Sequence, residues 1–298
     1  MKITNKHNLP PLLVQALTWK KQKYCDYSVT ELLKAPQMLA LEKKHDADIE
    51  VDVIDSTWAF FGSAMHYVLE RLAKNQDILS EEKLIIEVDG KKIGGQPDIY
   101  YKESDGKWIL ADLKTTSAWS AKFEPAGKSE WHKQTNIYAY MLAKHGFPVD
   151  KIMIWQVLRD WSAREAQKEK EYPQSPIIIT EIPLRPPEKI EALLKSLIKK
   201  HVSAEIPSCT DEERWTRPTT WAVMLPKRVR AAKVCDTKES AEAHAKTLVG
   251  ATIVERPGAA TRCDRYCNVS KFCPQYNKSS LREEVEKIVF NEYEQEKC

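Results

Sequence analysis

The sequence predicts a mixed α/β protein, in which a central mixed sheet is flanked by helices and is followed by a small C-terminal ββαβ insert and a cysteine cluster. Three observations support this. Helical and strand patterns are mixed through the first two thirds of the chain, three apolar strands and two tight turns occupy residues 83–116, and composition changes after Pro207. We therefore expect a core at 1–206, a cysteine region with the insert at 207–275, and a helical tail at 276–298.

Composition narrows the class of protein. The 298 residues are 42% hydrophobic and 30% charged, with 9 Gly and 7 Cys. These values exclude disordered, collagen-like and disulfide-dense proteins. The net charge of +3 is too small to indicate nucleic-acid binding on its own, so a basic site must be local. No signal-peptide core or membrane span is visible, and we expect a cytoplasmic protein with no membrane partner.

Two helical segments are predicted before the first strands. Ser28-Val29-Thr30-Glu31 reads as a capping box at the start of an apolar-periodic run, and Pro36 predicts a break within that run. A second helix is expected from Asp55 or Ser56 to about Lys74.

An antiparallel meander follows, with turns at Asp89-Gly90 and Ser104-Asp105-Gly106. Its predicted strands are Leu84–Val88, Lys91–Glu103 and Trp108–Thr115. The rest of the core is read as a helix at Ser129–Lys144, a strand at Lys151–Arg159, a loop or wet hairpin at Ser162–Gln174, a strand at Ile177–Leu184 and a helix at Pro187–Val202. The insert is read as strands at Trp221–Leu225, Arg230–Cys235 and Thr252–Glu255 with a helix at Lys238–Leu248, and the tail as a charged helix at Ser280–Glu296.

Two acidic residues and a lysine carry the strongest chemical signal. Asp112 and Lys114 lie at the end of an apolar strand, and residues two apart share one face of a strand. If Ser104–Gly106 is a three-residue loop with Gly106 left-handed, Glu103 pairs with Lys107 and Asp98 lies opposite Asp112, with Cβ atoms ~5 Å apart. A two-residue loop would instead place Asp98 opposite Leu113. Two carboxylates that close repel unless a cation lies between them, and oxygen ligands favour Mg²⁺ or Mn²⁺.

These residues resemble those of a known family. Pro97-Asp98 followed by Asp112-Leu113-Lys114 is similar to the motif of the PD-(D/E)xK nuclease superfamily. Gly62-Ser63-Ala64-Met65-His66 resembles the Gly-x-x-x-His motif of its RecB-like exonuclease branch, and Gln134-Thr135-Asn136-Ile137-Tyr138 resembles the Gln-x-x-x-Tyr motif of that branch. The resemblance covers roughly Tyr27–Leu158 and the C-terminal cysteines, and it implies a restriction-endonuclease-like core.

The resemblance also implies roles for these side chains. His66, Asp98, Asp112 and the Leu113 carbonyl would hold one or two ions, and Lys114 would orient the attacking water or stabilise the transition-state charge. Glu70, one helical turn beyond His66, could orient that imidazole. Gly62 would let its helix approach the sheet closely. As DNA-binding residues, Gln134 and Tyr138 could hydrogen-bond a phosphate or stack on a base.

Three cysteines within eleven residues predict a metal site. Cys263, Cys267 and Cys273 form a C-x3-C-x5-C array, and a fourth thiolate would complete a zinc site or an iron–sulfur cluster. The resemblance implies a 4Fe-4S cluster, although the usual first spacing is one residue shorter and Ala35 stands where an upstream cysteine is expected. Cys209 is the preferred fourth ligand, because a compact insert brings its own ends together. Cys25 is the second choice, and Cys235 and Cys298 are read as incidental.

The predicted substrate is DNA that is single-stranded or has ends. Cations and aromatic rings alternate at Lys20, Lys21, Lys23, Lys122, Lys128 and Lys133 with Trp19, Trp119, Trp131 and Tyr138, and Pro226–Arg230 adds a basic patch. The leading prediction is a Mg²⁺- or Mn²⁺-dependent DNA exonuclease in recombination or repair. The alternatives are a structure-specific endonuclease, a CRISPR-adaptation-type processing nuclease, or a non-catalytic DNA-binding module. No phosphate-binding helicase motif is present, so unwinding would need a helicase or annealing partner.

Overall fold

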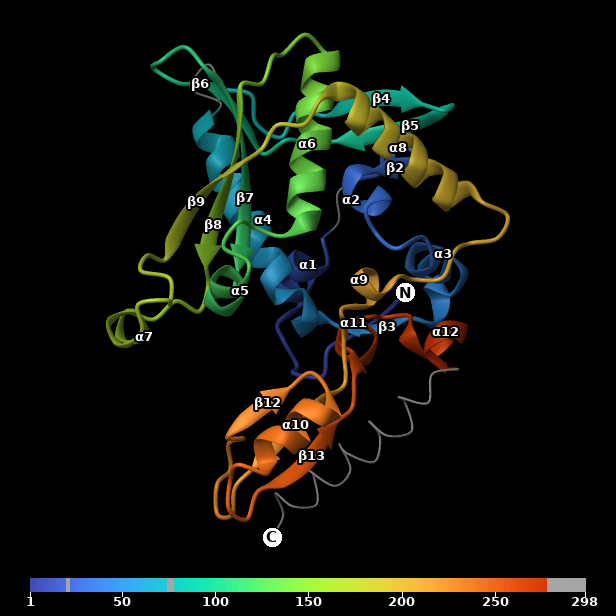
Figure 1. Ribbon diagram of the computed structural model, residues 1–298. Helices are drawn as coiled ribbons and strands as arrows, with labels where there is room; N and C mark the ends of the chain where they lie inside the picture. Colours follow the sequence, from blue (N-terminus) through green and yellow to red (C-terminus); the bar gives the residue numbers. More distant parts are fainter. Residues whose placement is uncertain (20–21, 74–77, 278–298) are drawn as a thin grey trace. The chain divides into compact units, whose positions relative to one another are not determined.

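The computed structural model describes residues 1–19, 22–73 and 78–277 (Figure 1). The chain divides into two compact units. Of the described residues, the large unit takes those within Lys2–Lys34 and Glu50–Glu205, and the small unit takes Met1, Ala35–Ile49 and those from Ile206 to Asn277. Lys20, Lys21, Lys74, the predicted tail helix and Cys298 lie outside the described residues.

A four-stranded mixed sheet forms the centre of the large unit, in the order β6-β7-β8-β9. Strands β7 and β8 are parallel, and the two outer pairs are antiparallel. Helix α6 packs on one face through a core that includes Ile137, Met141 and Leu110, while α4 packs on the other. The elements of this layer are β6 (Ile99–Lys102), β7 (Trp108–Thr116), β8 (Lys151–Leu158), β9 (Ile177–Ile182), α4 (Thr57–Ala73), α5 (Ala118–Phe123), α6 (Ser129–Lys144) and α7 (Ala163–Lys168).

A second sheet of the large unit has the order β2-β5-β4, and its core is continuous with that of α6. Helices α2 and α8 add Leu32 and Leu194 to the same cluster of buried side chains. A short parallel pair, β1 with β3, precedes α4. These elements are β1 (Lys2–Thr4), α1 (Pro11–Thr18), β2 (Tyr27–Ser28), α2 (Val29–Leu32), β3 (Glu50–Asp52), η2 (Val53–Ser56), β4 (Leu84–Val88), β5 (Lys91–Gly95) and α8 (Pro187–Val202).

The small unit contains a three-stranded antiparallel sheet in the order β12-β11-β13, with α10 packed on it around Val223 and Ala241. This is the ββαβ insert. The elements of the unit are α3 (Pro36–Lys44), η1 (Asp46–Asp48), α9 (Asp211–Arg214), β10 (Thr216–Arg217), β11 (Thr220–Met224), β12 (Lys233–Cys235), α10 (Lys238–Ala245), β13 (Thr252–Arg256), β14 (Ala259–Ala260), α11 (Thr261–Arg265), η3 (Ser270–Phe272) and α12 (Pro274–Asn277).

The predicted mixed α/β architecture is confirmed, with two local corrections. The strand expected at Lys91–Glu103 is broken into β5 and β6, which belong to different sheets. Pro97 lies at the break, and proline cannot donate a hydrogen bond to a strand ladder. The segment expected to be a loop or hairpin contains α7, whose N-cap Ser162 accepts a hydrogen bond from the Glu165 amide. The predicted break at Pro36 is confirmed, because α2 ends before it and α3 begins at it.

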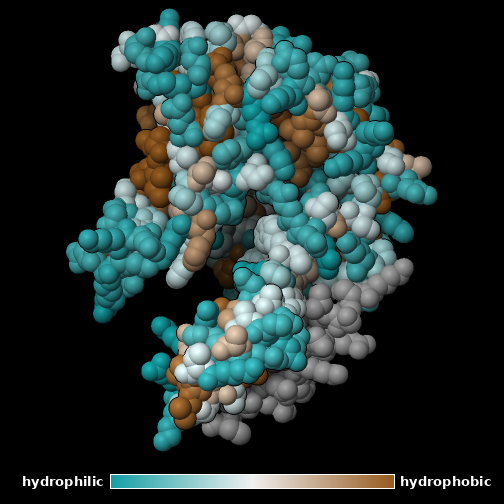
Figure 2. Space-filling view, in the orientation of Figure 1, coloured by the Kyte–Doolittle hydropathy of each residue, from teal (hydrophilic) through white to brown (hydrophobic). Residues whose placement is uncertain are grey.

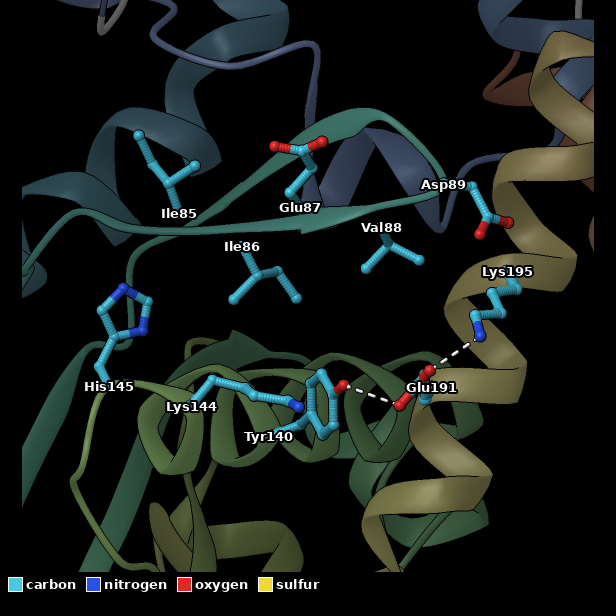
Figure 3. Close-up of a pocket in the computed structure, with 10 residues that line it drawn as sticks. All are labelled: Ile85, Ile86, Glu87, Val88, Asp89, Tyr140, Lys144, His145, Glu191 and Lys195. Carbon is cyan, nitrogen blue, oxygen red and sulfur yellow. Dashed lines mark hydrogen bonds and ion pairs between the residues drawn. The ribbon is translucent and has the colours of Figure 1, made fainter.

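Among the hollows that described residues line, two belong to the large unit. An apolar groove of 600 Å³ runs between α4 and the sheet, where Ile177 and Ile179 of β9 are more than half exposed. Figure 2 shows hydrophobic side chains gathered on this side of the sheet. A cavity of 490 Å³ separates β4 from α6 and α8, with Ile86 and Val88 pointing towards the helices and Glu87 pointing away (Figure 3). None of the predicted site residues lines that cavity. Among the described residues, no helix is long and apolar enough to cross a membrane.

Gly95 at the end of β5 is required by close packing. A Cβ atom there would lie 2.7 Å from Met141 Sδ and 3.0 Å from Tyr138 Cε1 of α6. Gly62 of α4 is different, because its Cβ would meet Thr115 Oγ1 at 3.6 Å, an ordinary van der Waals contact. The prediction that Gly62 is needed for close approach of its helix is therefore wrong.

These two glycines predict opposite effects on stability. Gly95→Ala should lower the free energy of unfolding by about 1–3 kcal/mol, because α6 must move away from β5. Gly62→Ala should raise it by about 0.5–1 kcal/mol, because alanine costs less backbone entropy in a helix. Denaturant unfolding of both variants checks this, and a Gly95→Ala protein as stable as Gly62→Ala would contradict the packing argument.

Candidate active site

The register of β6 on β7 brings the two acidic residues together. The observed pairs run from Lys102↔Trp108 to Ile99↔Ala111, and Glu103 N–H donates to the Lys107 carbonyl at 2.8 Å. Gly106 has a φ of +88°, so the loop is the three-residue turn that the sequence predicts. The same register, extended one step beyond the last pair, sets Asp98 opposite Asp112.

Asp98 is held by backbone and side-chain contacts. Its Oδ2 accepts a hydrogen bond from the Leu113 amide at 2.7 Å, and its Oδ1 lies 3.3 Å from His66 Nδ1. The Ser80 hydroxyl donates to the Asp98 carbonyl at 2.8 Å. Because the N–H and C=O of a strand residue point to the same side, the Leu113 carbonyl faces the same edge as Asp98.

Glu81 completes this group and was missed by the sequence reasoning. Its Oε1 lies 3.3 Å from His66 Nδ1, and the ligand atoms of His66, Glu81 and Asp98 all lie within 4.8 Å of one another. In sequence Glu81 is one of several acids before β4, and nothing there sets it apart. It is placed by tertiary bonds, since its N–H donates to the Pro97 carbonyl at 3.0 Å and the Gln96 amide donates to its carbonyl at 3.1 Å.

Glu81 also has an unusual backbone conformation. Its φ of +55° lies in the left-handed region, which glutamate seldom adopts. Such strain persists only where surrounding contacts impose it, and it gathers at functional sites. Glu70, which was predicted to orient His66, is not needed for that, because Glu81 and Asp98 both contact Nδ1; a contact of Glu70 with His66 stays a prediction.

Asp112 and Lys114 form a buried ion pair on β7. Lys114 Nζ lies 2.7 Å from Asp112 Oδ2, and the Asp112 side chain is fully buried. Apart from that ammonium group, neither carboxylate oxygen has a hydrogen-bond partner among the described residues. Burial raises the pKa of Asp112 to about 6; the Lys114 charge opposes this rise and the Asp98 charge adds to it.

Gln134 and Tyr138 of α6 hold the lysine from the helix side. Lys114 Nζ donates to Gln134 Oε1 at 3.0 Å, and Gln134 Nε2 donates to the Tyr138 hydroxyl at 3.0 Å. Tyr138 is only 5% exposed, and burial followed by the Asp112 charge raises its pKa. Contact of these two residues with DNA, as predicted from the sequence, is untested by this arrangement.

The donor set fits a hard divalent ion. The carboxylates of Glu81 and Asp98 and the imidazole of His66 have their ligand atoms within 4.8 Å of one another. The oxygens of Asp112 lack neutral donors among the described residues. Burial lowers the pKa of His66, but the hydrogen bonds and charges of Asp98 and Glu81 outweigh burial and raise it to about 10. The two carboxylates thus attract positive charge. A bound divalent ion would neutralise them in place of the proton on the His66 imidazolium.

The predicted cysteines are divided between the two units. Cys209, Cys263, Cys267 and Cys273 belong to the small unit, and Cys25 belongs to the large unit, where a Cβ on Gly94 would lie 2.5 Å from its sulfur. The pKa of Cys209 is raised to about 12 by burial, with further contributions from Glu213 and from the other three thiols. These four sulfurs therefore lie close enough to influence one another's charge. They do not, however, all lie within 4.8 Å of one another, as the ligand atoms of His66, Glu81 and Asp98 do.

The backbone of Cys209 is fixed by glutamine side chains. Its N–H donates to Gln37 Oε1 at 3.1 Å and to Gln275 Oε1 at 2.9 Å, and Gln275 returns a hydrogen bond to its carbonyl at 2.9 Å. Gln275 follows Cys273 by two residues, so these bonds tie Cys209 to the C-terminal array. Cys235, read as incidental, is 4% exposed and packs in the core of the insert.

Among solved structures, the chain is similar to SSO0001, with 20% identity and a TM-score of 0.43 over 63% of this chain and 83% of that chain. No curated protein matches. The PD-(D/E)XK nuclease superfamily matches residues 25–274, which is more than four fifths of the 298 residues. The chain therefore belongs to the PD-(D/E)XK nuclease superfamily.

Proposed function

We propose that this protein is a Mg²⁺- or Mn²⁺-dependent DNA exonuclease of the RecB-like branch, acting on ends or single strands in recombination or repair. The observation that carries the proposal is the convergence of Asp98, Asp112 and Lys114 at the edge where β6 ends and β7 continues. His66 and Glu81 add two further donors to that edge. A degenerate, purely DNA-binding core would have no need of a buried lysine–aspartate pair beside three metal-ligand groups.

His66, Glu81 and Asp98 would hold the ion, with Asp112 and the Leu113 carbonyl on its β7 side. When bound, the ion would lower the pKa of a water molecule and offset charge on the scissile phosphate. Asp98 receives the Leu113 amide on one oxygen, which orients the other towards His66. Lys114 would orient the attacking water or stabilise the phosphate charge, because its ammonium is fixed next to Asp112.

Gln134 would act as a positioning residue for Lys114. Its amide accepts from the ammonium and donates to Tyr138, so its orientation is fixed at both ends. An ammonium with three donors can then bond Asp112 and Gln134 and still offer one N–H to a water or phosphate oxygen. The DNA contact predicted for Gln134 and Tyr138 would use the second amide N–H of Gln134 and the hydroxyl proton of Tyr138.

The substrate proposal is tested with end-labelled and circular single strands in Mg²⁺. An exonuclease degrades the linear strands and leaves circles intact, whereas a structure-specific or CRISPR-adaptation-type endonuclease cuts circles or junctions. A binding module shifts both substrates and cuts neither, which would contradict the proposal. Adding a helicase to blunt duplex tests whether an unwinding partner is needed.

Lys114→Ala should reduce the cleavage rate by about 100- to 1,000-fold, because a preorganised charge next to the reacting phosphate is lost. Affinity for DNA, measured by electrophoretic shift without divalent ion, should stay near that of the wild type. A Lys114→Ala enzyme that cuts at the wild-type rate would show that the lysine has no role in the reaction.

Gln134→Ala is the matched variant. It keeps the ammonium but frees it from α6, so kcat should fall by less than in Lys114→Ala while KM is little changed. Gln134→Glu retains an acceptor for the lysine and should recover part of the lost rate. Equal loss in Gln134→Ala and Gln134→Glu, with KM raised in both, would instead favour a direct DNA contact.

We also propose that Cys209, Cys263, Cys267 and Cys273 hold a 4Fe-4S cluster, with zinc as the alternative. Support comes from the shared neighbourhood of the four thiols and from the Gln275 bonds to Cys209. The six cysteines that the structure describes are free thiols, which suits the reducing cytoplasm in which we propose the protein works.

Cys209→Ser should remove the cluster, whereas Cys25→Ser should keep it, because Cys25 packs against Gly94 in the other unit. Anaerobically purified protein should show broad visible absorbance, iron and acid-labile sulfide. Stoichiometric zinc without iron would contradict the iron–sulfur assignment, and unchanged metal content in Cys209→Ser would contradict the fourth ligand.

A further inference from the structure

Three large aromatic side chains are exposed near the carboxyl ends of β7 and β8. Trp58 of α4 is 54% exposed, and Trp119 and Phe123 of α5 are 58% and 69% exposed. We propose that these rings, together with Lys122 and Arg159, form an aromatic platform on which unpaired bases of single-stranded DNA stack beside the active site. The proposal rests on the nuclease function proposed above and adds how its substrate is held.

The members of the platform are linked by contacts. Trp119 and Phe123 stack with ring centroids 5.4 Å apart, and the Lys122 ammonium lies 5.4 Å and 5.9 Å from their centroids. The Arg159 guanidinium lies 4.8 Å from the centroid of Trp58. The Arg159 amide donates to the Thr116 carbonyl at 3.0 Å, which joins the end of β8 to the end of β7 just before α5.

The platform lies close to the candidate active site along two chain segments. Trp58 precedes His66 by eight residues on α4, which is about 12 Å along a helix. Trp119 follows Lys114 by five residues, and α5 lies at the carboxyl ends of β7 and β8 (Figure 1). The two segments are neighbours there, because a Cβ on Gly62 would lie 3.6 Å from Thr115.

The chemistry of the platform favours nucleic acid over a protein partner. Exposed aromatic rings with adjacent cations suit stacked bases and their phosphates, and stacking does not depend on base identity. Two nearby acids have other partners, since Asp160 accepts from the Ala118 amide at 2.7 Å and Glu124 accepts from Ser120 at 3.3 Å. Glu169 pairs with Lys122 of the platform itself, so Arg159 supplies the charge that is left for phosphates. Arg159 is exposed and its guanidinium lies over the ring of Trp58, so its charge faces solvent.

The test compares two strands that differ only in their bases. Fluorescence anisotropy without divalent ion measures the affinity of full-length protein for a labelled oligothymidine and for an abasic strand of equal length. Trp119→Ala and Phe123→Ala should each weaken oligothymidine binding by roughly 5- to 150-fold and leave abasic-strand binding unchanged. Ile179→Ala, which truncates an equally exposed aliphatic side chain on β9, is the control and should bind both strands like the wild type.

Trp119→Tyr keeps a stacking ring and should recover most of the affinity, which separates stacking from a defect in folding. Equal weakening on both strands, or no weakening on either, would overturn the platform; the second result is also the one expected if these rings serve a protein partner. A wild type that binds bases through the platform but never cuts in Mg²⁺ would overturn only the nuclease proposal. Cleavage with unchanged binding in Trp119→Ala would overturn only the platform.

Discussion

The three-residue turn between β6 and β7 determines where the acidic groups of the active site lie. Because Gly106 adopts a φ of +88°, Glu103 pairs with Lys107 and every later pair follows from it. A register shifted by one residue would turn Asp98 away from the face that Asp112 and Lys114 share. The Leu113 amide, which donates to Asp98 at 2.7 Å, then holds the two strands at the position where β6 ends.

This register places several charges where water is scarce. Asp112 is fully buried and Asp98 is 8% exposed, so the repulsion between them is not screened by solvent. Lys114 and His66 offset part of it, and burial still raises the pKa of Asp112. A site that keeps this much negative charge in a small buried volume is suited to binding a divalent ion, and its lysine is held in place by the helix α6 rather than by solvent.

Much of this site could be predicted because its determinants are local. The strand alternation that pairs Asp112 with Lys114 and the loop that sets the register are both visible in the sequence, as is the i, i+4 spacing of Gln134 and Tyr138. Glu81 could not be predicted, since it reaches His66 only through bonds of its backbone to Gln96 and Pro97. The break between β5 and β6 was missed although its signal is local: Gly94-Gly95-Gln96-Pro97-Asp98 interrupts the apolar pattern, and a proline cannot donate to a strand ladder.

The two units contain different groups of candidate functional residues. In the large unit, α4 supplies both His66 to the metal-ligand group and Trp58 to the aromatic platform, so one helix would position the ion and the strand. In the small unit, glutamine side chains fix Cys209 next to the C-terminal cysteines. Sequence spacing alone did not decide whether Cys209 or Cys25 is the fourth cysteine of the group. The proposed phosphodiester cleavage and the proposed cysteine cluster thus belong to separate parts of the chain.

The most direct measurement of the central claim is a calorimetric titration of Mn²⁺ into metal-free wild-type protein and into Asp98→Asn. We expect the wild type to bind Mn²⁺ and the variant to lose this binding, because Asp98 lies between His66 and the β7 edge. Unchanged affinity and stoichiometry in a folded Asp98→Asn protein would show that the converging acids do not hold an ion, and the catalytic assignment would be contradicted.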